Sequence, residues 1–68
     1  MIAEVLGNTI DFSKITRVSK IGGDENWLRY TVYFVGGDKI DIYENRLGEG
    51  FPREKFVELW KKLANNYA

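Results

Sequence analysis

The chain has 68 residues, ten Lys+Arg against ten Asp+Glu, and neither Cys nor His. The lack of Cys excludes disulfides, thiolate nucleophiles and Cys-type zinc or iron–sulfur sites, and the lack of His removes the usual base at neutral pH and the commonest metal ligand. A formal charge of zero gives no global attraction to nucleic acid or to an anionic membrane. We therefore expect one domain, residues 1–68, that is not an enzyme and holds no metal and no cofactor.

The sequence shows no signal for targeting or for a membrane span. Residues 1–6 lack a basic segment followed by a long apolar run, and no stretch approaches the ~18 consecutive apolar residues of a membrane-spanning helix. We expect a cytoplasmic, unprocessed protein with no membrane contact. A chain of this length buries only about 60% of the surface that its unfolded form exposes, so its large apolar side chains should nearly all be needed for the core.

The first predicted element is a tight hairpin at Gly7-Asn8. This dipeptide lies between the short runs Ile2–Leu6 and Thr9–Phe12, and it favours the positive backbone φ of a two-residue turn. The register that follows has three pairs: Val5 with Ile10, Ala3 with Phe12, and Glu4 with Asp11. The last pair sets two carboxylates opposite each other, so that face should lie in water. Apolar residues then recur every third position up to Val18, which predicts a helical turn at Ser13-Lys14-Ile15.

The longest predicted strand is Trp27–Val35, which follows a polar turn at Gly22–Asn26. Successive side chains of a strand point to opposite faces, so its even and odd positions separate. The even positions are apolar and are expected to face the core: Leu28, Tyr30, Val32 and Phe34. The odd positions form the other face: Trp27, Arg29, Thr31, Tyr33 and Val35. One helix covers only one face of a sheet, so we expect the odd face to be solvated or bound by a partner.

A second turn at Gly36-Gly-Asp38 leads into the strand Lys39–Glu44. A three-residue loop here keeps the even face apolar across both strands. Its register has two such pairs: Phe34 with Ile40, and Val32 with Ile42. A two-residue turn at Gly37-Asp38 would instead place Ile40 and Ile42 on the odd face. We prefer the three-residue loop.

The segment that begins at Pro52 predicts an amphipathic helix, because Pro is tolerated in the first turn, where its missing N–H is not needed. Apolar side chains recur at helical spacing and form one stripe: Phe56, Leu59, Trp60, Leu63 and Tyr67. We expect Trp60, in the middle of the stripe, to be the central contact of the helix with the sheet. Its expected partners are Val32, Phe34 and Ile42.

The order of these elements predicts an α+β fold, an antiparallel β-meander of about four to five strands with one C-terminal amphipathic helix packed on one face. A short strand ends in Ile10-Asp-Phe-Ser-Lys-Ile15, two longer strands are joined by Gly36-Gly-Asp38, and a helix follows. In this order, residues from about Thr9 to Ala64 resemble the later part of a small bacterial pleckstrin-homology-like domain. The chain departs from that family in length, since it lacks the residues for a seven-stranded barrel. It also shows no basic loop cluster for lipid binding, so no lipid-binding residues are carried over.

The strongest candidate site is the odd face of the sheet. Its residues are Trp27, Arg29, Thr31, Tyr33 and, from the next strand, Tyr43. Trp, Tyr and Arg are enriched at interface hot spots because they bury large areas and still donate hydrogen bonds. The alternative is an ordinary solvated sheet in which Arg29 pairs with Asp41 or Glu44. A large exposed patch of this kind is unusual on a monomer, which favours an interface with a protein partner or with a second copy.

The same side chains are also of the kinds that stack on the bases of a single-stranded nucleic acid. Four carboxylates are expected to dilute the positive potential there: Glu4, Asp11, Asp41 and Glu44. The neutral charge balance argues against this function as well. We therefore rank weak single-stranded nucleic-acid binding second, behind a protein-interaction module of the adaptor or inhibitor type. A third alternative is a half-barrel that completes itself with a second copy.

Two glycine-containing loops give weaker signals. Gly22–Asn26 gathers carboxylates but lacks the ligand spacing of a calcium loop. Gly48–Pro52 precedes a helix N-terminus, where an anion can bind backbone N–H groups, but it has no phosphate-loop Lys and no Ser or Thr. We retain Arg46 and Glu49 as candidate loop contacts, because loops carry function in many proteins.

Overall fold

The structure is a computed structural model that describes residues 2–24, 27–45 and 50–65. Its elements in chain order are β1 (Ile2–Val5), β2 (Asn8–Asp11), the 3₁₀ helix η1 (Phe12–Lys14), β3 (Ile15–Val18), β4 (Leu28–Phe34), β5 (Lys39–Asn45) and α1 (Arg53–Asn65). The strands form two antiparallel sheets, β1-β2 and β3-β4-β5. The predicted α+β fold with one C-terminal helix is therefore confirmed. No helix in these ranges is long and apolar enough to cross a membrane.

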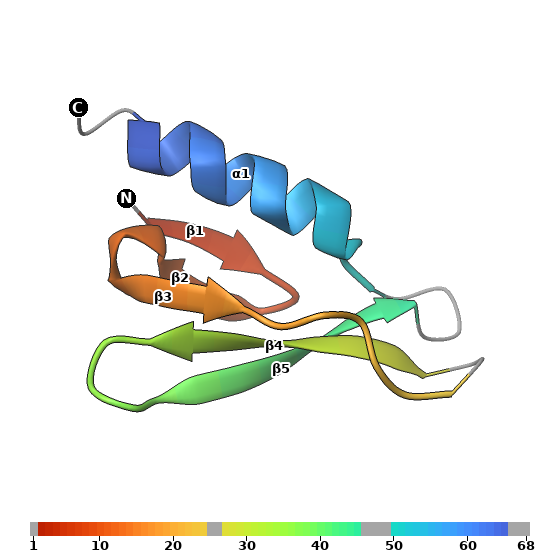
Figure 1. The fold of residues 1–68 in the computed structure, drawn as a ribbon. Helices are drawn as coiled ribbons and strands as arrows, with labels where there is room; N and C mark the ends of the chain where they lie inside the picture. Colours follow the sequence, from red (N-terminus) through yellow and green to blue (C-terminus); the bar gives the residue numbers. More distant parts are fainter. Residues whose placement is uncertain (1, 25–26, 46–49, 66–68) are drawn as a thin grey trace.

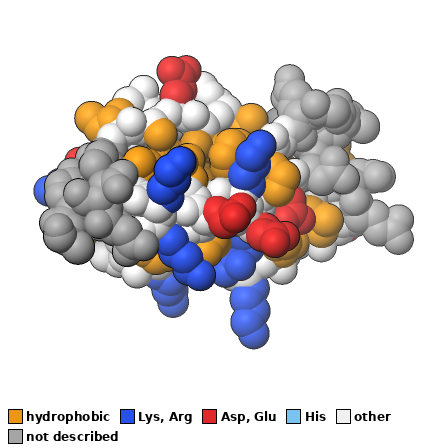
Figure 2. All heavy atoms as spheres, turned by 90° about the horizontal axis from the view of Figure 1, so that it is seen from above, with side chains coloured by type: hydrophobic (Ala, Val, Ile, Leu, Met, Phe, Trp, Pro, Cys, Tyr) orange, Lys and Arg blue, Asp and Glu red, His pale blue; other side chains and the backbone are white. Residues whose placement is uncertain are grey.

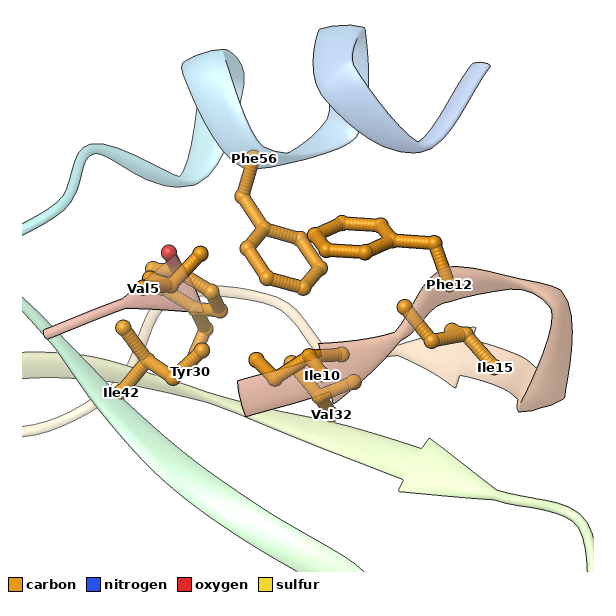
Figure 3. Close-up of a cluster of buried hydrophobic side chains, with 8 residues drawn as sticks. All are labelled: Val5, Ile10, Phe12, Ile15, Tyr30, Val32, Ile42 and Phe56. Atoms are coloured by element: carbon orange, nitrogen blue, oxygen red, sulfur yellow. The ribbon is translucent and has the colours of Figure 1, made fainter. Parts of the chain in front are cut away.

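The β1-β2 hairpin and helix α1 both lie on the same side of the three-stranded sheet, with the hairpin between the helix and the sheet (Figure 1). The core is where the three meet, and its buried members are Val5, Ile10, Phe12, Ile15, Tyr30, Val32, Ile42 and Phe56. Phe56 points from the helix toward the strands, with Phe12 of η1 beside it (Figure 3). Its ring centroid lies 5.0 Å from that of Phe12 and 5.7 Å from that of Tyr30. The even positions of the long strand thus face the core as predicted.

The expected central role of Trp60 is wrong, because Phe56 occupies that place. Phe56 is completely buried, whereas Trp60 is partly buried and packs at the margin of the core. The physical reason is the hairpin and η1, which lie under the helix and make Phe12 the first side chain that the helical stripe meets (Figure 1). Leu59 and Leu63 continue the stripe as partly buried residues, and Tyr67 lies outside the described residues.

The first hairpin turns one residue earlier than predicted. Leu6 and Gly7 are its two turn residues, with φ of 49° and 79°, the positive values that a type I′ turn requires at both positions. Asn8 instead opens β2, and its Nδ2 donates to the carbonyl oxygens of Val5 and Leu6, at 3.4 Å each. The observed pairs are Ile2 with Asp11, Ala3 with Ile10, Glu4 with Thr9, and Val5 with Asn8. The predicted pairs Val5–Ile10, Ala3–Phe12 and Glu4–Asp11 are therefore wrong by two residues, a shift that leaves every side chain on its predicted face.

The second hairpin differs from the prediction in the same way. Phe34 N–H donates to the carbonyl of Asp38 at 2.8 Å, so the loop is Val35–Gly37, and both of its glycines have φ of 95°. The pairs on the core side are Tyr30 with Ile42 and Val32 with Ile40, in place of Val32 with Ile42 and Phe34 with Ile40. A three-residue loop is confirmed, one residue earlier than expected, and the even face stays apolar across both strands.

The single helical turn predicted at Ser13-Lys14-Ile15 is confirmed as η1. Asp11 caps it by accepting hydrogen bonds from Ser13 Oγ at 2.6 Å and Ser13 N–H at 3.0 Å. These two bonds hold the pKa of Asp11 below its ordinary value of 3.8.

The approach to helix α1 is fixed to the sheet by side-chain and backbone hydrogen bonds. Phe51 N–H donates to the carbonyl of Tyr43 at 2.8 Å, and Arg53 N–H donates to Glu44 Oε1 at 3.1 Å. The Arg53 guanidinium Nε donates to the carbonyl of Ser19 at 2.6 Å. A carboxylate on the N–H groups of a first turn also suits the helix dipole. Glu44 is therefore a helix-capping residue, and its side chain serves the core side of the sheet.

Candidate binding surface on the outer face of the sheet

The face of the β3-β4-β5 sheet that points away from the hairpin and helix is the candidate site, here called the outer face. Its residues are Arg17, Trp27, Arg29, Thr31, Tyr33, Lys39, Asp41 and Tyr43. Figure 1 shows no described element on this side of the sheet. The five residues predicted from the sequence, Trp27, Arg29, Thr31, Tyr33 and Tyr43, thus share one surface. Their binding role stays a prediction.

At one end of the outer face, Tyr33 lies between two cations. The Arg17 guanidinium carbon is 4.1 Å from the centroid of the Tyr33 ring, within the range of a cation–π contact, and Lys39 is the cross-strand partner of Tyr33 on β5. Arg17 reaches this face because β3 has a bulge between Ile15 and Arg17. An unbroken register from Ile15 would have set Arg17 opposite Val32 on the core side.

The middle of the outer face is polar and internally bonded. Thr31 Oγ1 donates to Asp41 Oδ1 at 2.6 Å, and Ser19 Oγ accepts from Thr31 N–H at 2.8 Å. The alternative reading of this face paired Arg29 with Asp41 or Glu44, and the register contradicts it, because the cross-strand partner of Asp41 is Thr31 and that of Arg29 is Tyr43.

The other end combines Arg29, Tyr43 and Trp27. The Trp27 and Tyr43 rings meet edge to face, with centroids 6.1 Å apart, and Trp27 keeps 37% of its surface exposed. A turn places the indole: Trp27 N–H donates to the carbonyl of Asp24 at 3.0 Å, and Gly23 approaches the Trp27 carbonyl so closely that a Cβ there would lie 2.4 Å from its oxygen. Gly23, at φ 100°, is thus required by both its conformation and its space.

The charge on the outer face is more positive than the sequence suggested. It carries three cations, Arg17, Arg29 and Lys39, and one carboxylate, Asp41. The expected dilution by Glu4, Asp11 and Glu44 is wrong. Glu4 and Asp11 belong to the hairpin on the far side of the sheet, and Glu44 caps the helix.

The helix side of the molecule has a different charge pattern. Basic and acidic side chains lie close together there, with hydrophobic side chains between them (Figure 2). A hollow of about 390 Å³ runs along the helix and is lined by both signs of charge, Lys55 and Lys62 with Glu58. The outer face is therefore the surface on which one sign of charge and the exposed aromatic rings coincide.

The weaker predicted sites add no built cavity to this description. Arg46 and Glu49 lie outside the described residues, as does part of the Gly22–Asn26 turn. Within residues 2–24, 27–45 and 50–65, no three acidic side chains are grouped so that they could hold a metal ion. Sequence reasoning missed Arg17 and Lys39 as members of the outer face. The signal for Lys39 was its odd position, whereas Arg17 required knowledge of the bulge.

Comparison of the chain with protein-family models, with curated proteins and with solved structures gives no significant match. The resemblance to pleckstrin-homology-like domains accordingly stays a prediction, and the function is argued from the surface alone.

Proposed function

We propose that the chain is a non-enzymatic interaction module that docks an acidic surface of a partner protein on its outer face. The observation that carries the proposal is the coincidence of Trp27, Tyr33 and Tyr43 with three cations and one carboxylate on a sheet face that no described element covers. Aromatic rings and Arg supply most of the energy in protein interfaces, and complementary charge speeds and selects the encounter.

The charge also bears on whether the partner is a second copy. A two-fold dimer that used the outer face on both chains would set this surface against itself. Three cations and one carboxylate would then oppose the same set, and like charges in contact are destabilising. This arrangement favours a different, acidic protein over face-to-face self-association.

The test compares two charge-matched double variants. Arg17→Glu with Arg29→Glu reverses the outer face, and Lys55→Glu with Lys62→Glu makes the same charge change on the exposed side of the helix. Proteins captured from an extract of the source cells by immobilised wild type are purified, and their affinities are measured by calorimetry. We expect an acidic partner whose affinity falls at least thirtyfold, about 2 kcal/mol, only for the outer-face variant. Equal binding by both folded variants would contradict the proposal.

Single-stranded nucleic acid is the second candidate, favoured by the same three cations interleaved with aromatic rings. About three phosphates would be neutralised, which predicts a slope of roughly −2 for log affinity against log salt and a Kd weaker than ~10⁻⁵ M at physiological salt. Fluorescence anisotropy with a labelled single-stranded oligonucleotide at two salt concentrations measures both values. Submicromolar binding that Arg17→Glu with Arg29→Glu abolishes would put nucleic acid in place of the acidic protein.

A further inference from the structure

Strand β5 is an edge of the three-stranded sheet, and its hydrogen-bonding phase is known. Phe34 and Asp38 form a hydrogen-bonded pair, so the even residues of β5 direct their backbone groups to β4 and the odd residues direct theirs to the open edge. The bond from Phe51 N–H to the carbonyl of Tyr43 agrees with this phase, because it approaches β5 from the edge side.

This bond also limits the edge. Beyond Tyr43 the strand is covered by Phe51, whereas the N–H and C=O groups of Lys39 and Asp41 point outward and bond to no other described residue. The open segment Lys39–Asp41 is only about 10 Å long. Its two outward-pointing residues carry opposite charges on the outer face. Any strand that pairs here must therefore satisfy four backbone groups and two charged side chains.

We propose that a second copy of the chain pairs with this edge in an antiparallel manner, with Ile40 of both copies on the two-fold axis. Hydrogen bonding across the edge requires odd residues to face odd residues. Registers centred on Lys39 or on Asp41 would set identical charges opposite each other. The register centred on Ile40 sets Lys39 of each copy opposite Asp41 of the other, so that two ion pairs and four backbone hydrogen bonds form together.

The inner side of the same edge also suits this register. Ile40 is partly buried and borders a hollow of about 540 Å³ whose apolar lining includes Ile10, Phe34 and Val35. On the axis the two Ile40 side chains would form a non-hydrogen-bonded pair, the arrangement in which opposite Cβ atoms are nearest. Each Ile40 then covers part of the apolar lining of the other copy. The dimer would form a six-stranded sheet whose two outer faces lie side by side.

The competing interpretation is that Lys39 and Asp41 protect the edge from pairing, as charges on natural edge strands do. The two interpretations differ in a charge-swap experiment. Sedimentation equilibrium is run from about 10 µM to 1 mM, the range expected for so small an interface. The chains are wild type, Lys39→Asp, Asp41→Lys, the double swap, and Lys55→Asp on the helix as the control. Circular dichroism establishes that each variant is folded.

We expect wild type, the control and the double swap to dimerise, and each single variant to associate at least tenfold more weakly. Mixing the two single variants should restore dimers, because Asp at 39 then meets Lys at 41 and Lys39 meets Asp41. This mixture keeps the test decisive even where the double swap fails to fold. A wild type that is monomeric at 1 mM would overturn the proposal, as would single variants that dimerise like wild type. Neither result touches the outer face as a docking surface for another protein, since those measurements use Arg17 and Arg29.

Discussion

Two tyrosines three residues apart on β4 show how differently the two sides of this sheet are used. Tyr30 is 1% exposed, and its hydroxyl donates to the carbonyl of Phe51 at 2.7 Å. Tyr33 lies on the outer face under the Arg17 guanidinium, half-buried and open to a partner. Both are the same residue type in one strand. Their roles are set by the face to which each side chain points, one holding the fold together and the other forming the surface.

The inner side should show the largest effect on stability. Phe56→Ala removes a completely buried ring that contacts Phe12, Tyr30 and Phe51, and we expect a loss of about 3–5 kcal/mol, enough to unfold a chain of this size. Trp60→Ala should cost less, because Trp60 lies at the margin of the core. Urea unfolding followed by circular dichroism ranks the two variants. A larger loss for Trp60→Ala would show that the helix is rotated or shifted.

The outer side should respond in binding and not in folding. Replacing Arg29 with Lys and Tyr33 with Ser should change the free energy of unfolding by less than about 1 kcal/mol, since surface changes are usually small. Affinity for an acidic partner should fall by about 2 kcal/mol. Unfolding curves and calorimetry on the same preparation separate the two quantities. A loss of stability as large as that of Phe56→Ala would remove the distinction between the two sides.

The hydroxyl of Tyr30 gives a pH-dependent test of the inner side. Burial, and after it the Glu44 carboxylate, raises the pKa of Tyr30 above its ordinary value of 10.0. The unfolded chain therefore releases this proton first as the pH rises. The stability from this group is full below about pH 10 and falls as the pH rises toward the folded-state pKa. Tyr30→Phe should cost about 1–2 kcal/mol at pH 8, because it leaves the Phe51 carbonyl without its donor.

Urea unfolding at pH 8 and at pH 10.5 measures both parts of this prediction. The difference in stability between wild type and Tyr30→Phe should shrink at the higher pH. Tyr33→Phe, on the other face, is the matched control. If Tyr33→Phe reproduced the pH dependence of Tyr30→Phe, burial of Tyr30 would not be its cause.

The smallest expected effect is a gain at the hairpin that covers the inner side. Leu6 adopts φ of 49°, which is unfavourable for a branched side chain, and Asn followed by Gly is the preferred pair for this turn. Leu6→Asn should stabilise the fold by about 0.5–1 kcal/mol and leave association through the outer face unchanged. The urea midpoint measures the gain. A lower midpoint would contradict a turn centred on Leu6 and Gly7.

The alternation in Trp27–Val35 was enough to predict the two faces, the core members Tyr30 and Val32, and the shared surface of Trp27, Arg29 and Tyr33. The period of two is a local property of the chain, so sequence carries it. Both turns were placed one residue late, because glycine accepts positive φ in several turn types and nothing local marks Leu6 for that conformation.

The remaining differences depend on contacts between distant segments. Arg17 joins the outer face through a bulge that is defined only by the pairing of β3 with β4. Glu44 leaves the outer face because the helix begins beside it. Phe56 replaces Trp60 in the core because η1 lies under the helix. Sequence periodicity contains none of these three relations.

The two tryptophans of the chain are divided between the two sides, Trp27 on the outer face and Trp60 on the helix. Intrinsic fluorescence therefore reports two events at once in the native chain. In a Trp60→Phe variant, all indole emission comes from Trp27, beside Tyr43. Its shielding from a soluble quencher such as acrylamide then follows occupancy of the outer face directly, without an attached dye and before any partner has been named.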